Sequence, residues 1–201
     1  MAPGRHFRGD PAKAFERVVL QYEAELTAFI DLMIKNSVRS YLEIGSKFGG
    51  SLWRIGSALG VGSRVVAVDL PDGTDEWDAS HASLSACIDR LRERGCDASV
   101  ILGDSTDADT IDAVKQLGPF DAIFIDGDHR LEGIQKDWAN YGPLGKMVAF
   151  HDIAWRNGPK DRGYIIDAPI FWADVKHKYR NAEIKLDPTK RDNGIGVLWK
   201  D

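Results

Sequence analysis

The stretch YLEIGSKFGGS, residues 41–51, decides the fold of this chain. It opens with tyrosine, leucine and isoleucine around a single acid, a run that is typical of a buried strand. Glycines follow at positions 45, 49 and 50, and glycine lets a backbone turn tightly and approach a ligand closely. We therefore expect a strand over 40–44, a glycine loop, and a helix over 51–59.

Alternating strand and helix patterns continue on both sides of this loop. Short apolar runs predict further strands over 64–69, 98–102, 120–126, 146–151, 182–186 and 195–199. Three- and four-residue apolar spacing predicts helices over 11–36, 77–94, 106–117, 131–141 and 169–179. We therefore predict an α/β fold, a Rossmann-like doubly wound sheet of seven strands, mostly parallel with an antiparallel C-terminal strand and with helices on both faces.

The chain is expected to form one domain. Its 201 residues fit a single α/β unit, and no repeat or low-complexity linker divides them. Residues 1–10 are polar and contain proline and glycine, which predicts a flexible N-terminal arm. Residues 11–201 then make up the domain.

Composition limits the partners that the chain could have. The formal net charge is −5, so there is no basic surface of the kind that nucleic acids require. No apolar run approaches the roughly 20 residues needed to cross a bilayer. Cys87 and Cys96 are the only cysteines, and the N-terminus lacks a hydrophobic signal core, which indicates a reducing, cytoplasmic setting. The amphipathic first helix could pack on a partner, so the chain could form a homo-oligomer.

The glycine loop differs from two known nucleotide-binding loops, because it lacks a residue that each of them requires. A dinucleotide fingerprint needs glycine where Lys47 stands, and the phosphate loop of NTPases needs lysine where Ser51 stands. A loop that only packs the helix on the strand is the structural alternative. Asp69 ends the second strand, 20 residues after Gly49, where an acid can accept hydrogen bonds from ribose hydroxyls or simply stabilise a turn.

Acids and histidines gather after the fourth and fifth predicted strands. The stretch IDGDHRLEG, residues 125–133, is followed by Asp137, and FHDI occupies residues 150–153. With the acid-x-Gly-x-x-x-Gly loop, these motifs resemble class I S-adenosylmethionine-dependent methyltransferases. The resemblance is to the branch of sugar and natural-product O-methyltransferases and cephalosporin hydroxylase-like proteins, and it covers roughly residues 41–153. The chain departs from that pattern at residues 144–146, Leu-Gly-Lys, where relatives commonly have Pro-Gly-Gly.

The resemblance implies S-adenosylmethionine as cofactor and O-methylation of a small hydroxylated acceptor, such as a sugar or a natural-product intermediate. The alternatives are a hydroxylase-like enzyme on the same fold and a non-catalytic nucleoside-binding partner protein. The implied cofactor-binding residues are Glu43, Gly45, Ser46, Gly49, Ser51, Asp69, Leu70, Asp104, Ser105 and Asp126. Asp104 would lie near the adenine amine, although it could equally cap the next helix.

Elementary chemistry suggests roles for the acid and histidine residues. Asp126 and Asp152 end neighbouring predicted strands, and two close carboxylates repel each other unless a cation lies between them. Mg²⁺ prefers oxygen ligands, so we expect a magnesium site at Asp126 and Asp152, with His151 either a further ligand or a core residue. Lys or Arg partners could instead separate the two acids. We expect His129 and Asp126 to be the catalytic residues, with His129 as the general base, since imidazole titrates near neutral pH.

Two further interpretations concern Asp128 and the segment after the fifth predicted strand. Asp128 has the structural alternative of capping the helix that follows it. The segment 154–172 could form a lid over the reaction, with Trp155 and Tyr164 as lid residues and with Phe171 and Trp172 in the core.

Overall fold

A computed structural model describes residues 10–71, 80–155, 165–186 and 193–200. These residues form a seven-stranded sheet in the order β3-β2-β1-β4-β5-β7-β6. The strands are β1 Ser40–Ile44, β2 Arg64–Asp69, β3 Asp97–Leu102, β4 Phe120–Ile125, β5 Gly145–Phe150, β6 Arg180–Ile184 and β7 Ile195–Trp199. Pairing is parallel from β3 to β5, and β7 is antiparallel to both of its neighbours. The predicted fold class is confirmed.

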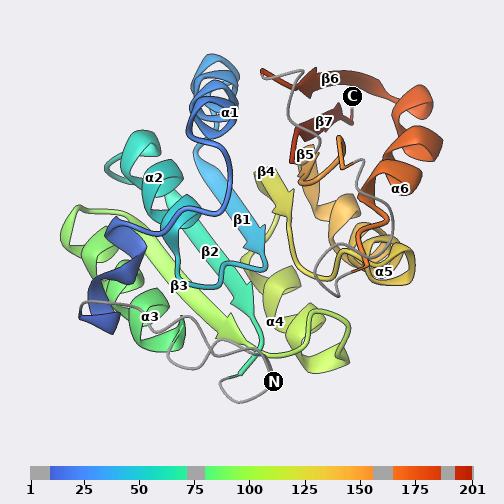
Figure 1. Cartoon of the computed structure of the whole chain (residues 1–201). Helices are drawn as coiled ribbons and strands as arrows, with labels where there is room; N and C mark the ends of the chain where they lie inside the picture. Colours follow the sequence, from blue (N-terminus) through green and yellow to red (C-terminus); the bar gives the residue numbers. More distant parts are fainter. Residues whose placement is uncertain (1–9, 72–79, 156–164, 187–192, 201) are drawn as a thin grey trace, which may run out of the picture.

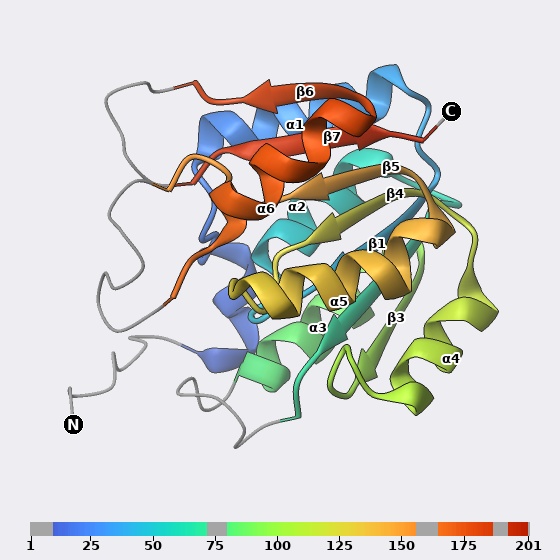
Figure 2. The same cartoon turned by 90° about the vertical axis from the view of Figure 1, so that its right-hand side faces the viewer.

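Helices cover both faces of the sheet (Figures 1 and 2). One face carries α1 Glu23–Lys35, α2 Gly50–Leu59 and α3 Ser80–Glu93, together with the 3₁₀ helix η1 Pro11–Glu16. The other face carries α4 Ala108–Leu117, α5 Leu131–Tyr141 and α6 Ala168–Val175. The central strands are therefore buried on both sides, which explains why they read as nearly continuous apolar runs in the sequence.

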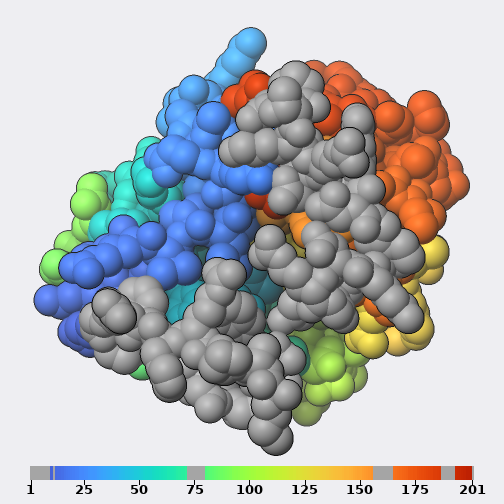
Figure 3. All heavy atoms as spheres, in the orientation of Figure 1, coloured from blue at the N-terminus to red at the C-terminus, as the bar shows by residue number. Residues whose placement is uncertain are grey.

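Two halves of the chain meet in the middle of the sheet. The strand order reverses between β1 and β4, which is the point where parallel sheets of this type leave a crevice for a ligand. The N-terminal elements lie to the left and the C-terminal elements to the right in the space-filling view (Figure 3). The crevice between the halves is where the candidate site has to be sought.

The expected helix over 11–36 is wrong. The chain forms η1, then an extended connection over residues 17–22, and only then α1. The apolar spacing runs through both helices, but the connection passes close over the glycine loop. A Cβ on Gly50 would lie 1.9 Å from the carbonyl oxygen of Val18. The break places this connection, rather than a helix face, against the loop.

Other boundaries differ by a few residues. The predicted helix over 106–117 begins at Ala108, and the one over 169–179 ends at Val175, followed by the 3₁₀ turn η3 Lys176–Lys178. The strand expected over 182–186 begins at Arg180, because it pairs with β7 from that residue. The proposed arm lies outside the described residues except for Asp10, as does the start of the helix expected over 77–94. In the described ranges no helix has the length and apolar character to cross a membrane.

Candidate functional site

Backbone hydrogen bonds extend the strand ladder beyond the strands and bring the candidate residues together. Asp126 N donates to the Ile44 carbonyl at 2.9 Å, and His151 N donates to the Ile125 carbonyl at 3.2 Å. Beside the acid and histidine residues lies a cavity of about 1050 Å³. Ligand pockets typically occupy roughly 300–1,000 Å³, so this cavity has room for a cofactor and a second small reactant.

The glycine loop forms one wall of this cavity. Gly45 has a φ of +86°, and a Cβ there would lie 2.4 Å from the carbonyl oxygen of Asp126, so only glycine fits. Gly49 has a φ of +81° and is the N-cap residue of α2. Ser46 lines the cavity, and its buried hydroxyl lies beside the Glu43 carboxylate, where it helps to lower the pKa of that acid. The loop therefore brings closely packed backbone and the Ser46 residue to the wall of the cavity.

Asp69 and Leu70 lie at the end of β2, on the same cavity. The Asp69 carboxylate accepts hydrogen bonds from Lys47 N, in the glycine loop, and from Leu70 N at 2.9 Å. This carboxylate thus lies beside the loop, where the sequence predicted a ribose-binding acid. Leu70 is 39% exposed and borders the cavity with an apolar surface.

Glu43 lies beneath the loop and is not among the residues that line the cavity. Its carboxylate is fully buried and accepts hydrogen bonds from Tyr41 Oη at 2.5 Å and from Ser51 Oγ at 2.8 Å. Burial raises the pKa of Glu43 to about 7, and the nearby charge of Asp126 adds to that rise. The structure therefore gives Glu43 a supporting position beneath the loop, from which it holds Ser51, a residue of the cavity wall.

Asp104 and Ser105 follow β3 and line the cavity. Asp104 accepts from the backbone N and the hydroxyl of Thr106, both at 2.8 Å, in the turn before α4. The N-cap residue of α4 is Asp107, so the alternative in which Asp104 caps that helix is wrong. Ser105 Oγ donates to Asp137 at 2.6 Å. Asp137 is completely buried, and burial raises its pKa to about 6. Asp137 was not among the predicted site residues, although it follows the 125–133 motif in the sequence.

The acids and histidines form a compact group behind the loop. His151 Nδ1 lies 3.0 Å from Asp126 Oδ1 and 3.3 Å from Asp152 Oδ1. His129 Nδ1 lies 3.2 Å from Asp152 Oδ2, and its Nε2 lies 3.9 Å from Asp126 Oδ1. His151 and Asp152 are buried, whereas the His129 side chain is 32% exposed. His129 is therefore the member of the group that both solvent and a ligand can reach.

Charges within this group set its protonation. Burial lowers the pKa of His151, but Asp126 and Asp152 outweigh that effect and raise it to about 9. Burial would raise the pKa of Asp126, yet the charge and hydrogen bond of His151 hold it below its ordinary value. At neutral pH the group therefore contains an imidazolium at His151 and a carboxylate at Asp126.

The structure does not support the predicted magnesium site at Asp126, His151 and Asp152. Mg²⁺ prefers oxygen ligands in a regular octahedron, whereas the His151 ring lies between the two carboxylates and carries the positive charge there. In the part of the chain that the structure describes, no group of three or more His, Cys, Asp or Glu side chains could hold a metal ion. The residues as placed do not fit the ion.

The backbone around the group is also specialised. Asp152 has a φ of +60°, in the left-handed region that favours glycine. Asp128 accepts from the backbone N of Arg130 at 3.0 Å and pairs with its guanidinium at 2.6 Å, just before α5 begins. Asp128 therefore stabilises the turn that leads into α5, whose N-cap residue is Arg130, and it does not cap the helix itself, which was its structural alternative.

The sequence analysis did not identify Gln21 as a site residue. Gln21 lies in the connection over residues 17–22, lines the cavity, and donates from Nε2 to Asp126 Oδ2 at 2.6 Å. No local pattern could have revealed this contact, because the two residues are 105 positions apart.

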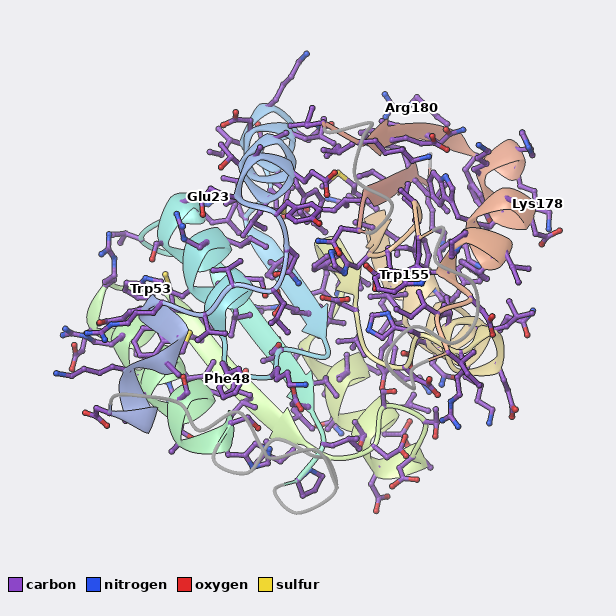
Figure 4. All side chains as sticks on the ribbon, viewed as in Figure 1. Glu23, Phe48, Trp53, Trp155, Lys178 and Arg180 are labelled. Carbon is purple, nitrogen blue, oxygen red and sulfur yellow. The ribbon has the colours of Figure 1, made fainter. Side chains whose placement is uncertain are left out.

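Only part of the proposed lid lies within the described residues. Tyr164 falls outside them, whereas Trp155 is partly buried and is not among the residues that line the cavity. In Figure 4, Trp155 lies on the side of α5 and α6. Phe48, which belongs to the glycine loop, lies on the side of α2 and α3. Phe171 and Trp172 are buried in the core, as predicted.

Comparisons with known proteins agree with this architecture. A family model described as a methyltransferase domain matches residues 42–153. The solved structure of the O-methyltransferase TomG from Streptomyces achromogenes, in complex with SAM, is 16% identical at a TM-score of 0.66, with 94% of this chain and 88% of that chain covered. An O-methyltransferase from Bacillus cereus in complex with SAH is 17% identical at a TM-score of 0.65, with 98% and 94% covered.

A third solved structure, cofactor-bound Rv0187 from MTB, is 19% identical at a TM-score of 0.64, with 94% of this chain and 85% of that chain covered. No curated protein matches the chain. At these identities the structural likeness concerns the fold, and the family match is the finding that bears on function.

Proposed function

The chain belongs to the methyltransferase-domain family whose model it matches over residues 42–153, and from that premise we propose that it moves the methyl group of S-adenosylmethionine to a hydroxyl of a small molecule. The acceptor class that we favour is a sugar or a natural-product intermediate. A cytoplasmic setting is part of the proposal and is supported by the two cysteines, which are free and buried.

Residues of the cavity wall fit the cofactor. Gly45 and Ser46 line the cavity where its amino-acid end can lie, and Asp69 can accept from its ribose hydroxyls. Leu70 and Ser105 border the space left for its adenine. When bound, the cofactor supplies a methyl group on a sulfonium, and the protein has to place an acceptor oxygen in line with it.

The observation that carries the proposal is the placement of His129. Asp152 Oδ2 lies 3.2 Å from His129 Nδ1, so a proton on that nitrogen is held by the carboxylate and Nε2 is left as the base. Nε2 can then take the proton of the acceptor hydroxyl as the oxygen attacks the methyl group. Asp126, 3.9 Å from Nε2, stabilises the positive charge that His129 acquires. In this proposal the positive partner of the two acids is His151, whose Nδ1 lies 3.0 Å from Asp126 and 3.3 Å from Asp152.

Methyl transfer from labelled S-adenosylmethionine to a panel of sugars and phenols tests this proposal. His129→Ala should lower kcat by roughly 10²–10⁴-fold, the usual range for losing an acid–base group, with little change in the KM for the cofactor. The matched control is His177→Ala, at an exposed histidine of η3, which should keep full activity. A folded His129→Ala protein with normal turnover would contradict the assigned base. Cofactor binding without methylation of any acceptor would favour the nucleoside-binding alternative.

A further inference from the structure

Gln21 occupies a position that the proposed chemistry does not use. The connection over residues 17–22 passes so close to α2 that a Cβ on Gly50 would strike the Val18 carbonyl. Val18, Leu20 and Gln21 consequently form part of the cavity wall, and Gln21 contacts the acid and histidine group through Asp126. Of these three side chains, only that of Gln21 can form hydrogen bonds.

The contact between Gln21 and Asp126 determines the orientation of the amide. The effect of burial on the pKa of Asp126 is outweighed by the charges of His151 and His129 together with the hydrogen bonds from His151 and Gln21, so the group is a carboxylate, which can only accept hydrogen bonds. The nitrogen of the amide must therefore face Asp126, and Nε2 does so at 2.6 Å from Oδ2. Oε1 is then directed away from Asp126. This oxygen is buried and has no partner in the described ranges, and Gln21 as a whole is only 7% exposed.

Gln21 also completes the set of donors around Asp126. Oδ1 of Asp126 faces His151 and His129, while Oδ2 faces Gln21. Rotation of the carboxylate would break both sets of contacts, so the amide keeps Oδ1 directed at the histidines. A buried acceptor such as Oε1 costs about 1–3 kcal/mol when it is left without a donor. A bound ligand that brings an N–H or O–H group into the cavity removes that cost.

From these contacts we infer that Gln21 is a positioning residue for methyl transfer: Nε2 holds Asp126, and Oε1 accepts a hydrogen bond from the bound ligand. The inference rests on the proposed function. The donor belongs either to the ammonium group of the cofactor or to a hydroxyl of the acceptor, and the chemistry is the same in both cases.

The first test needs no ligand. Gln21→Leu removes both polar atoms at similar volume, and Gln116→Leu on the exposed face of α4 is the matched control. In ¹H–¹⁵N spectra of the histidine rings, the signals of His151 should move in Gln21→Leu and stay in place in Gln116→Leu, because Asp126 is released. Gln21→Met serves as the second variant if the leucine variant does not fold. Unmoved His151 signals in a folded variant would overturn the positioning role.

The second test identifies the donor. Calorimetry with S-adenosylhomocysteine should show affinity lowered about three- to tenfold in Gln21→Leu if the ammonium of the cofactor is the donor. If the acceptor hydroxyl is the donor, that affinity stays within twofold and the KM for the acceptor rises instead. No change in either quantity would overturn the role of Oε1. Failure of the wild-type protein to bind S-adenosylhomocysteine would count against the proposed function itself, and the ring spectra would still decide the positioning role.

Discussion

At the scale of single residues, Asp137 should make the stability of the protein depend on pH. Its pKa rises to about 6 because burial penalises the charged form. Its favourable contribution to folding stability is therefore fully present below the pKa that the group has in the unfolded chain, and it is lost as the pH rises through 6. We predict that Asp137→Asn removes this dependence. Between pH 4 and pH 8, the free energy of unfolding of the variant should therefore rise by up to about 3 kcal/mol relative to that of the wild type. Urea unfolding at the two pH values measures it. The exposed Asp109→Asn is the control, and equal pH slopes for Asp137→Asn and wild type would refute the prediction.

His151 leads to a prediction about metal removal. Because its ring already places a positive charge between Asp126 and Asp152, chelation should leave the reaction nearly untouched. We expect turnover after EDTA treatment and gel filtration to stay within about twofold of the untreated enzyme, since the acids keep their positive partner. The assay is repeated with Mg²⁺ added back. Activity that is lost with EDTA and restored by Mg²⁺ would show that an ion displaces the His151 ring.

At the scale of elements, Glu25 connects α1 to the β6–β7 hairpin. Its buried carboxylate accepts from Gly194 N at 3.0 Å and from Leu186 N at 3.4 Å. In Figure 2, α1 lies beside these two strands. We predict that Glu25→Leu destabilises the fold by about 2–4 kcal/mol, because two backbone donors lose their acceptor.

Denaturant unfolding measures the effect of Glu25→Leu, with Glu23→Leu as the control. Glu23 is on the same helix but is exposed, and its ion pair with Arg54 lies at the surface, where such pairs contribute little. Equal losses in the two variants would mean that the contact with the hairpin does not stabilise the fold.

The element scale also shows how far the sequence could predict this structure. The strands were recognisable because burial on both faces imposes continuous apolar runs, and parallel strands place their terminal residues at one edge. This logic located Asp69, Asp126 and Asp152 in one region. The same logic failed for the helix predicted over 11–36. The apolar spacing continues through residues 17–22, where packing against Gly50 interrupts the helix. Gln21 could not be identified, since its partner lies far away in sequence.

At the scale of the whole molecule, the cavity lies between the two halves of the sheet, so a ligand that fills it should stabilise the entire fold. S-adenosylhomocysteine at 100 times its Kd should add about 2.7 kcal/mol, which corresponds to a rise in Tm of roughly 5–10 °C for a chain of this size. Thermal melts with increasing ligand measure it, with NAD as the comparison. The shift should shrink in Asp69→Ala, which loses the proposed ribose contact. An equal shift with NAD would point to a dinucleotide site instead.

The left-handed backbone at Asp152 has a consequence for redesign of this protein. A sequence optimised only for stability would place glycine there, because holding another residue in that region costs on the order of 1 kcal/mol. Such a design would gain in melting temperature while it deleted the carboxylate that orients His129. In a set of homologous sequences, an acidic residue retained at position 152 would thus indicate selection for the reaction. Glycine at that position would indicate homologues in which this selection has been lost.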